Sequence, residues 1–291
     1  VAYPDIHVAL DSPAMRGPYY GPDYIDHFRI GGVKISLDGS PQGKTAWLSQ
    51  PYYKVPAGEK ADYAGYPAYT DAQANELIGK AWDHGWQVLA HANGDAAIDQ
   101  FIHAVAAAEA AHPGKRLMPV LIHGQTLRRD QVGELRRLGI FPSLFPMHTY
   151  YWGDWHRDSV LGPERAENIS PTRWVLDAGM VFTSHHDAPV VFPDAMRVLD
   201  ATVNRTTRSG RVLGPEQRVT PEQALKSITL WAARQYAEQD RKGSIETGKR
   251  ADLVVLSDNP LTIAPARLHT IKVLQTIKDG EVVYAAEQAG K

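Results

Sequence analysis

The chain has 291 residues, of which 43% are hydrophobic and 22% are charged, and its formal net charge is −2. This is the composition of a globular protein, and so small a charge gives no basis for binding nucleic acid or a membrane surface. There is no cysteine, which excludes disulfides, iron–sulfur clusters and a thiol nucleophile. The apolar stretches are far shorter than the ~18–20 residues that span a bilayer. We therefore expect a cytoplasmic protein.

Strand-like and helix-like segments alternate along the first two thirds of the chain, which predicts an α/β fold with parallel strands. Strands are expected at 31–37, 86–91, 118–124, 140–146 and 180–184, and helices at 70–85, 95–112, 128–139 and 170–179. We expect Thr70 or Asp71, Asp95 and Ser170 to cap three of these helices. The spacing of these five strands is typical of βα units.

The pattern changes after residue 190. An amphipathic helix is expected at 220–237, followed by strands within 242–257 and 271–285. Asp279-Gly280 lies between two alternating apolar runs, which is a strong hairpin signal. The sequence therefore predicts a barrel-like portion over 1–240 and a small β module over 241–291.

Metal-competent side chains recur at or near the ends of successive predicted strands. They are Lys34 within the first strand, then His91, His123, His148 and Asp187. In a parallel (β/α) barrel the carboxyl ends of the strands converge on one face, where active sites form. We therefore expect these side chains to share a site.

These residue types suit the chemistry of a hydrolytic metal. Imidazole and carboxylate ligands favour Zn²⁺, and a bound metal lowers the pKa of water to about 7. An aspartate such as Asp187 can take a proton and return it to a leaving amine. Two interpretations of Lys34 stay open: a lysine carbamylated by CO₂ that bridges two metals, or a strand lysine paired with a carboxylate such as Asp38.

Several motifs are similar to those of a known family. "VKISLDGSPQGKTAWLSQPY", "LAHANGDAAID", "LIHGQ", "HHDAPV" and "GSIETGKRADLVVLSDNPL" occur in this order. Together they resemble the amidohydrolase superfamily, in the branch of YtcJ-like proteins and N-substituted formamide deformylases. The resemblance implies a metal-dependent hydrolase built on a (β/α)8 TIM barrel, with the C-terminal strands belonging to a β-sandwich.

The resemblance also implies roles for individual residues. Lys34 would be the carbamylated lysine that bridges two metals, and His91 and His123 would bind the second metal. Asp187 would bind the first metal and act as general base and acid. The metal would be zinc, with iron or manganese as alternatives. The reaction would be hydrolysis of a carbon–nitrogen bond in a small amide or formamide, with an ester, lactone or cyclic amide as alternatives.

One family feature has no counterpart in this chain. Family members carry a His-x-His pair at the end of the first barrel strand, whereas this sequence has only His7 near its start and the adjacent pair His185-His186. We therefore expect the chain to contain the third to eighth strands of a longer barrel. We expect either a homo-oligomer or an N-terminal half supplied by another chain, and the alternative is an inactive remnant that serves as a binding or assembly module.

Further candidates lie in the segments that follow the last two barrel strands. We interpret "FPMHTYYWGDWHRD", residues 145–158, as a substrate loop in which His148, Trp152 and His156 contact the substrate; the alternative is an aromatic loop that packs on its neighbours. His186 is expected either to contact the substrate or to stabilise the turn at Asp187. Arginines within 203–218 belong either to the pocket mouth or to the surface.

Overall fold

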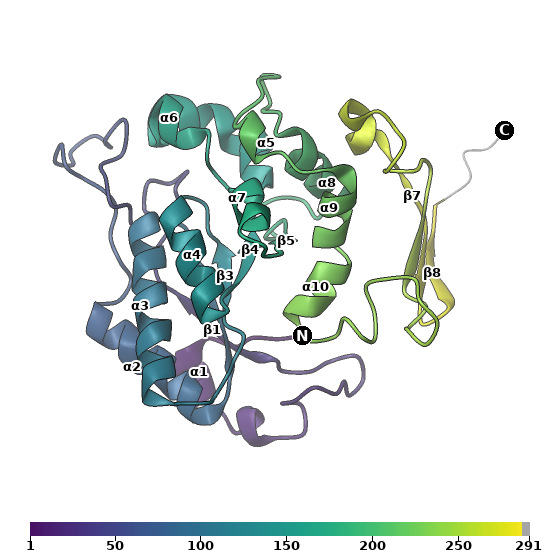
Figure 1. Ribbon diagram of the computed structural model, residues 1–291, viewed down its shortest axis with the longest axis horizontal. Coiled ribbons are helices and arrows are strands. Elements are labelled where there is room, and N and C mark those ends of the chain that lie inside the picture. The colour runs from purple at the N-terminus through teal and green to yellow at the C-terminus, as the bar shows by residue number, and fades with distance from the viewer. Residues whose placement is uncertain (287–291) are drawn as a thin grey trace.

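The computed structural model describes residues 1–286, and its centre is a parallel sheet (Figure 1). The five strands lie side by side in chain order, as expected when βα units wind in one direction. They are β1 (Gly32–Ser36), β2 (Gln87–Ala92), β3 (Val120–His123), β4 (Phe141–Leu144) and β5 (Thr183–Ser184). The α/β class and all five predicted strands are confirmed; four strands are shorter than expected, and β2 is shifted by one residue.

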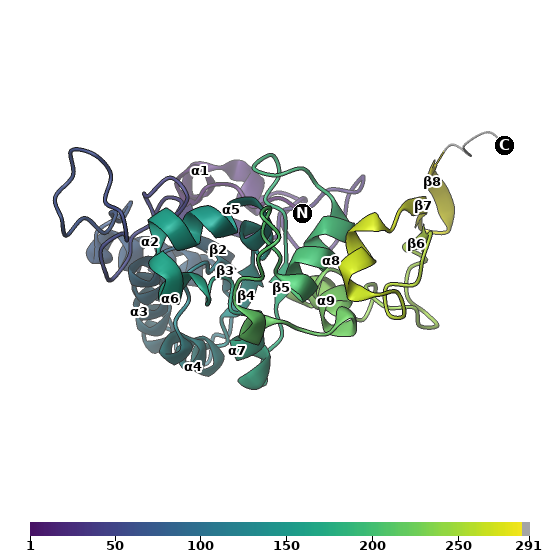
Figure 2. The same ribbon diagram turned by 90° about the horizontal axis from the view of Figure 1, so that it is seen from above.

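Helices pack against the outer face of this sheet (Figures 1 and 2). Those that follow the first three strands are α2 (Asp71–His84), α3 (Asp95–Ala111) and α4 (Arg129–Leu138). The other helical elements are α1 (Ile6–Asp11), η1 (Pro13–Arg16), α5 (Met147–Trp155), the π-helical turn η2 (His156–Val160), α6 (Gly162–Ala166), α7 (Thr172–Asp177), α8 (Ala195–Asn204), η3 (Pro215–Gln217), α9 (Pro221–Ser227), α10 (Leu230–Gln235) and η4 (Pro265–Thr270).

The two faces of the sheet belong to different apolar clusters, because successive side chains of a strand point to opposite faces. Val33, Ile35 and Ala90 belong to the large core shared with the helices. A second cluster, which contains Leu89 and Ile122 together with Val120 and Phe141, fills the inner face. Alternation therefore places Lys34 and His91 on the inner face, which turns toward the axis of the barrel.

The sheet is an open, partial barrel. On the outer side of β1, short parallel bridges join Ala2 to Ile30 and Asp5 to Lys34. At the other end, β5 pairs with β4 through only two residue pairs. Among residues 1–286 no strand pairing connects β5 back to the N-terminal segment. This is consistent with the expected partial barrel.

A second, antiparallel sheet stands beyond α8 and α9 (Figures 1 and 2). It contains β6 (Leu253–Leu256), β7 (Val273–Lys278) and β8 (Glu281–Ala285). The hairpin at Asp279-Gly280 is confirmed, and both residues have positive φ. Residues 287–291 of the expected β module lie outside the described residues, and its boundary at 240/241 stays a prediction.

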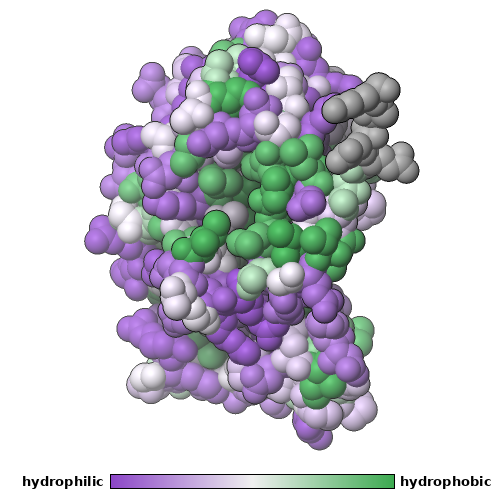
Figure 3. All heavy atoms as spheres, turned by 90° about the vertical axis from the view of Figure 1, so that its right-hand side faces the viewer, coloured by the Kyte–Doolittle hydropathy of each residue, from purple (hydrophilic) through white to green (hydrophobic). Residues whose placement is uncertain are grey.

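Apolar side chains gather on the face that carries this second sheet (Figure 3). Val254 and Val283 are 56% and 60% exposed. A groove of about 860 Å³ runs between the second sheet and the helices α9 and α10. Leu268 and Ile271, by contrast, are buried in the large core and attach this part of the chain to the barrel portion.

Several local expectations were wrong. Residues 145–158 were expected as a loop, but the chain is helical from Met147 to Val160 and forms α5 and η2, in which aromatic rings pack along the helix. The helix expected at 220–237 is two helices, because Thr229 has a non-helical backbone. Helix α8 was not among the helices expected from the sequence. No helix within residues 1–286 is both long and apolar enough to cross a bilayer.

The expected caps have mixed outcomes. Thr70 caps α2 through a full capping box, as predicted. Asp95 and Ser170 do not cap: Gly94 occupies the N-cap of α3, and Pro171 that of α7. The Asp95 carboxylate instead accepts hydrogen bonds from Ser49 and from Arg128. Asp95 therefore stabilises contacts between segments that are distant in the sequence, and not the N-terminus of α3.

Candidate metal centre

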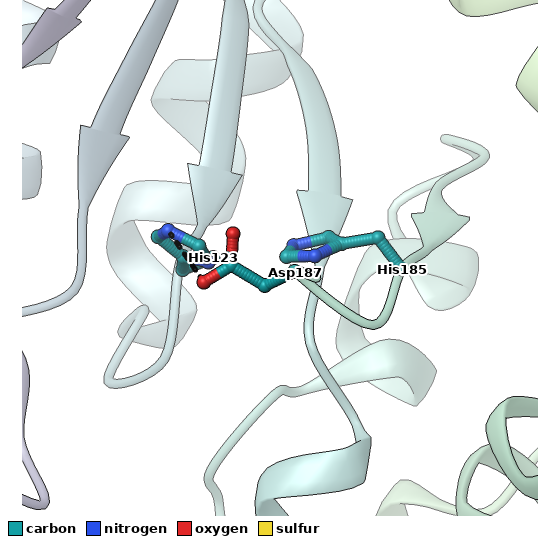
Figure 4. Close-up of side chains that lie close together, drawn as sticks. All are labelled: His123, His185 and Asp187. Atoms are coloured by element: carbon teal, nitrogen blue, oxygen red, sulfur yellow. Dashed lines mark ion pairs between the residues drawn. The ribbon is translucent and has the colours of Figure 1, made fainter. Parts of the chain in front are cut away.

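Three side chains with metal-binding atoms meet at the carboxyl edge of the parallel sheet (Figure 4). His123 is the last residue of β3, whereas His185 and Asp187 follow β5. One ligand atom from each lies within 4.8 Å of the others. The His123 Nε2 atom is 4.0 Å from Asp187 Oδ2. The structure thus brings together two of the predicted ligands, His123 and Asp187, and adds His185, which was not among the predicted ligands.

Unusual backbone conformations turn these side chains toward one another. His123 has a φ of 75° and Asp187 a φ of 53°, both in the left-handed region that non-glycine residues rarely adopt. In a regular strand His123 would share the helix-facing side with Leu121. Its ring instead lies against that of His91, with centroids 4.5 Å apart. The strand ending therefore delivers His123 to the inner face.

His91 completes this edge of the site from β2. Its Nε2 atom lies 3.0 Å from the Gly39 carbonyl oxygen, 3.1 Å from Asn93 Nδ2 and 3.4 Å from Asp38 Oδ1. These contacts fix the ring plane and leave Nδ1 without a hydrogen-bond partner among residues 1–286. Metal-binding histidines in proteins have this arrangement, in which one nitrogen is held by the surrounding protein.

Asp38 is the anchor of that arrangement. Its buried carboxylate accepts hydrogen bonds from the backbone amides of Trp47, Asn93 and Gly94, at 2.8–2.9 Å. Gly94 is required here, because a Cβ atom would collide with the Trp47 carbonyl oxygen. One carboxylate therefore holds the 38–47 loop against the β2–α3 turn and beside His91.

Lys34 lies partly buried on the inner face of β1. Among residues 1–286 it forms no ion pair, and the carboxylate of Asp38 is bound to backbone amides instead. The alternative of a Lys34–Asp38 pair is therefore wrong. Burial lowers the pKa of Lys34, and the negative charge of Asp187 opposes this shift. A lowered pKa favours the neutral amine, the form that reacts with CO₂.

Burial keeps the imidazoles of the cluster neutral. It lowers the pKa of His123 well below its usual range and that of His185 to about 3, and the positive charges of neighbouring groups act in the same direction. His123 Nδ1 and His185 Nε2 are sealed from solvent without a hydrogen-bond partner among residues 1–286. Buried polar atoms are normally paired, and neutral imidazole is the form that binds metals. These residues therefore fit a divalent metal.

An aromatic wall adjoins the cluster. The Phe145 ring stacks on His185, with centroids 4.9 Å apart, and meets the His148 ring edge-on, with centroids 4.7 Å apart. Trp152 is partly buried and lies 4.7 Å from His148. His156 is fully buried behind His148, so any effect on a substrate would pass through His148. The wall contains three of the four predicted substrate residues.

The fourth, His186, has a local role in this structure. Its Nδ1 atom accepts a hydrogen bond from the Ala188 amide at 3.1 Å. This contact stabilises the turn that carries Asp187, as in the second of the two interpretations of this residue. Whether it also contacts a substrate stays a prediction. Of the arginines in 203–218, Arg205 is fully buried against main-chain carbonyls, so it is neither at a pocket mouth nor on the surface.

A parallel sheet with histidines and an aspartate at its carboxyl edge has the arrangement in which α/β barrels form their active sites. The chain belongs to the amidohydrolase family, whose model matches residues 9–284. It is 28% identical over 282 residues to YtcJ of Bacillus subtilis (strain 168), a protein named as an amidohydrolase, and covers 51% of that protein. It is 29% identical over 261 residues to the N-substituted formamide deformylase of Arthrobacter pascens and covers 46% of it.

Solved structures show the same fold. A metal-dependent hydrolase from Pyrococcus horikoshii superposes with a TM-score of 0.76 at 25% identity, over 91% of this chain and 51% of that protein. A second one, from Pyrococcus furiosus, has a TM-score of 0.73 at 27% identity, over 90% of this chain and 51% of that protein. The chain spans about half the length of these relatives.

Proposed function

We propose that the protein is a metal-dependent hydrolase of carbon–nitrogen bonds other than peptide bonds, and that its substrate is a small amide or formamide. The observation that carries the proposal is the meeting of His123, His185 and Asp187 at the carboxyl edge of the sheet. Its two imidazoles are neutral and each has a sealed nitrogen without a partner among the described residues. The similarity to an N-substituted formamide deformylase supports the amide class of substrate.

His123 and Asp187 would hold the metal, together with His185 and with His91 from the neighbouring strand. Nitrogen and oxygen donors in this mixture suit zinc, and iron or manganese would also be accepted. A bound divalent ion supplies Lewis acidity at this edge of the sheet. Lys34, once its neutral amine has added CO₂ and released a proton, would contribute a carbamate oxygen.

Asp187 would carry the proton. Its side chain is 38% exposed, so it can reach both the metal-binding cluster and an incoming substrate. Its carboxylate would accept a proton from the attacking water and return it to the departing nitrogen. The aromatic wall of Phe145 and Trp152 would exclude water from one side of the substrate.

The test is hydrolysis by the purified chain after addition of Zn²⁺, Mn²⁺ or Fe²⁺. The panel would pair N-substituted formamides and acetamides with the matching esters and lactones. We expect metal-dependent release of amine from the amides. A preference for esters would change the substrate class, and failure to bind any metal in a folded chain would contradict the proposal in favour of a binding or assembly module.

A further inference from the structure

Two buried histidines are joined by a direct hydrogen bond next to the candidate metal centre. His148 Nδ1 lies 2.9 Å from His156 Nε2, and the two residues are 2% and 0% exposed. Residues eight apart in a straight α-helix are separated by about 12 Å along the axis, yet these ring centroids are 5.2 Å apart. The contact therefore depends on how the two side chains are oriented.

The local helix geometry supports a specific role for this contact. His156 is the first residue of the π-helical turn η2, which follows α5 directly. Such turns are rare and occur frequently at functional sites. The His148 ring packs against the rings of Phe145, Trp152 and His156, which restricts its orientation.

The hydrogen bond restricts the tautomers of both rings. Burial lowers the pKa of His148 well below its usual range and that of His156 to about 3, so both rings are neutral. A neutral imidazole has one N–H donor and one acceptor nitrogen. Either His148 donates from Nδ1, or His156 donates from Nε2. In the first arrangement His148 Nε2 is an acceptor and His156 Nδ1 carries a proton. In the second arrangement His148 Nε2 carries a proton and His156 Nδ1 is an acceptor.

The sealed nitrogen of His156 decides between them. His156 Nδ1 is buried without a partner among residues 1–286. If His148 were the donor, His156 would bury an N–H group without an acceptor, and orphaned buried N–H groups are rarer than unpaired acceptors. If His156 is the donor, its Nδ1 is a bare acceptor and His148 carries its own proton on Nε2.

His148 Nε2 is the atom that can reach a ligand. It has no hydrogen-bond partner among residues 1–286, and unlike His156 Nδ1 it is not sealed from solvent. We propose that His156 is a positioning residue that holds His148 with its proton on Nε2, so that His148 presents a hydrogen-bond donor to the substrate. The ligand must then offer an acceptor there, and on the proposed function this is the carbonyl oxygen of the amide.

The direct test is the protonation of the His148 ring nitrogens. The full chain with ¹⁵N-labelled histidine would be studied by long-range ¹H–¹⁵N correlation, before and after addition of Zn²⁺. Signals would be assigned by their loss in His148→Gln. We expect the proton on Nε2 and a deprotonated, hydrogen-bonded Nδ1. A proton on Nδ1 would overturn the proposal, because Nε2 would then be a lone pair suited to binding metal.

Variants of His156 test its positioning role. His156→Phe removes the donor, and we expect a mixture of His148 tautomers and a fall in kcat of about 10-fold or more, with a smaller change in KM. His156→Gln keeps an amide donor near the position of Nε2 and should restore the Nε2–H tautomer and most of kcat. Retention of a single tautomer in His156→Phe would contradict the role of His156.

A matched control is His84→Leu, an exposed histidine that stacks on Trp86 at the end of α2. It should leave the His148 spectrum and kcat unchanged. If His156→Phe does not fold, the wild-type spectrum still decides the tautomer. The Nε2–H form in a chain that hydrolyses no amide would refute the proposed function alone, whereas hydrolysis with the proton on Nδ1 would refute this inference alone.

Discussion

The Nε2 atom of His123 lies 4.0 Å from Oδ2 of Asp187, and both residues have left-handed backbones. Such conformations cost about 1–3 kcal/mol each and persist where the surrounding structure enforces them. His123 ends β3 and Asp187 follows β5. The two strained backbones therefore come from separate strands and lie next to each other. Their coincidence at the candidate metal centre supports its functional assignment.

Asp187→Asn should abolish most of the activity. The amide cannot accept a proton, and loss of a general base lowers kcat/KM by about 10²–10⁴-fold. Because the side chain is partly exposed, the melting temperature should change little. Rates on an amide substrate and thermal melting would check this, with Asp177→Asn on the outer helix α7 as a control. A fully active Asp187→Asn variant would remove Asp187 from the mechanism.

Asp38→Asn should weaken both the fold and metal binding. The amide cannot accept three backbone N–H groups, and an unpaired buried donor costs about 1–3 kcal/mol. Loss of a group that orients a metal-binding histidine lowers metal affinity about 10–100-fold. Urea unfolding and zinc titration measure the two effects. Asp83→Asn, at an exposed pair with His112, is the control; equal effects of the two substitutions would contradict the anchoring role.

Lys34→Arg should lower the metal content. Arginine keeps the positive charge and cannot lose its proton to form a carbamate. Elemental analysis of the purified variant would give the metal stoichiometry, and zinc uptake by the wild type should increase when bicarbonate is supplied. Unchanged stoichiometry in Lys34→Arg, together with uptake independent of bicarbonate, would show that Lys34 is not a ligand.

The free energy of unfolding should fall as the pH is lowered below about 6.5, where an unfolded histidine begins to bind a proton. Burial lowers the pKa of His156 to about 3, so between these values only the unfolded state is protonated there. The expected loss is about 1.4 kcal/mol per pH unit for this residue. Urea unfolding at pH 6 and pH 5 would measure it.

Both His156→Phe and His156→Gln should make that pH dependence shallower by the same amount, since neither side chain titrates in this range. This agreement would separate proton binding from loss of packing, which differs between the two side chains. A pH dependence identical to that of the wild type in both variants would mean that His156 is protonated in the folded state.

The positions of Lys34, His91 and His123 were predictable from local sequence. Each lies in or at the end of a short apolar run bounded by turn residues, and the carboxyl ends of parallel strands meet at one edge. The role of Thr70 as the N-cap of α2 was also predictable, because a capping box depends only on neighbouring residues. These features depend on a few neighbouring residues and on no distant contact.

Features that depend on tertiary contacts were missed. His185 joins the cluster because the backbone at Asp187 is left-handed and Phe145 stacks on the ring, neither of which the sequence shows. The adjacent pair His185-His186 was visible in the sequence, which favoured His186 as the site residue, whereas the structure places His185 in the cluster. Residues 145–158 were expected to be a loop, because the helix that they largely form is held by aromatic packing rather than by a regular apolar stripe.

The hydrogen bonds of Asp38 have a consequence for protein engineering. The loop at 38–47 and the His91 ring are both held by the Asp38 carboxylate. They therefore form one structural unit, and neither can be replaced without affecting the other. A graft intended to change substrate preference through this loop must keep Asp38, the amide of Trp47 and the glycine at position 94. Libraries that randomise the loop between Asp38 and Trp47 should therefore yield more folded, metal-loaded variants than libraries that include either end.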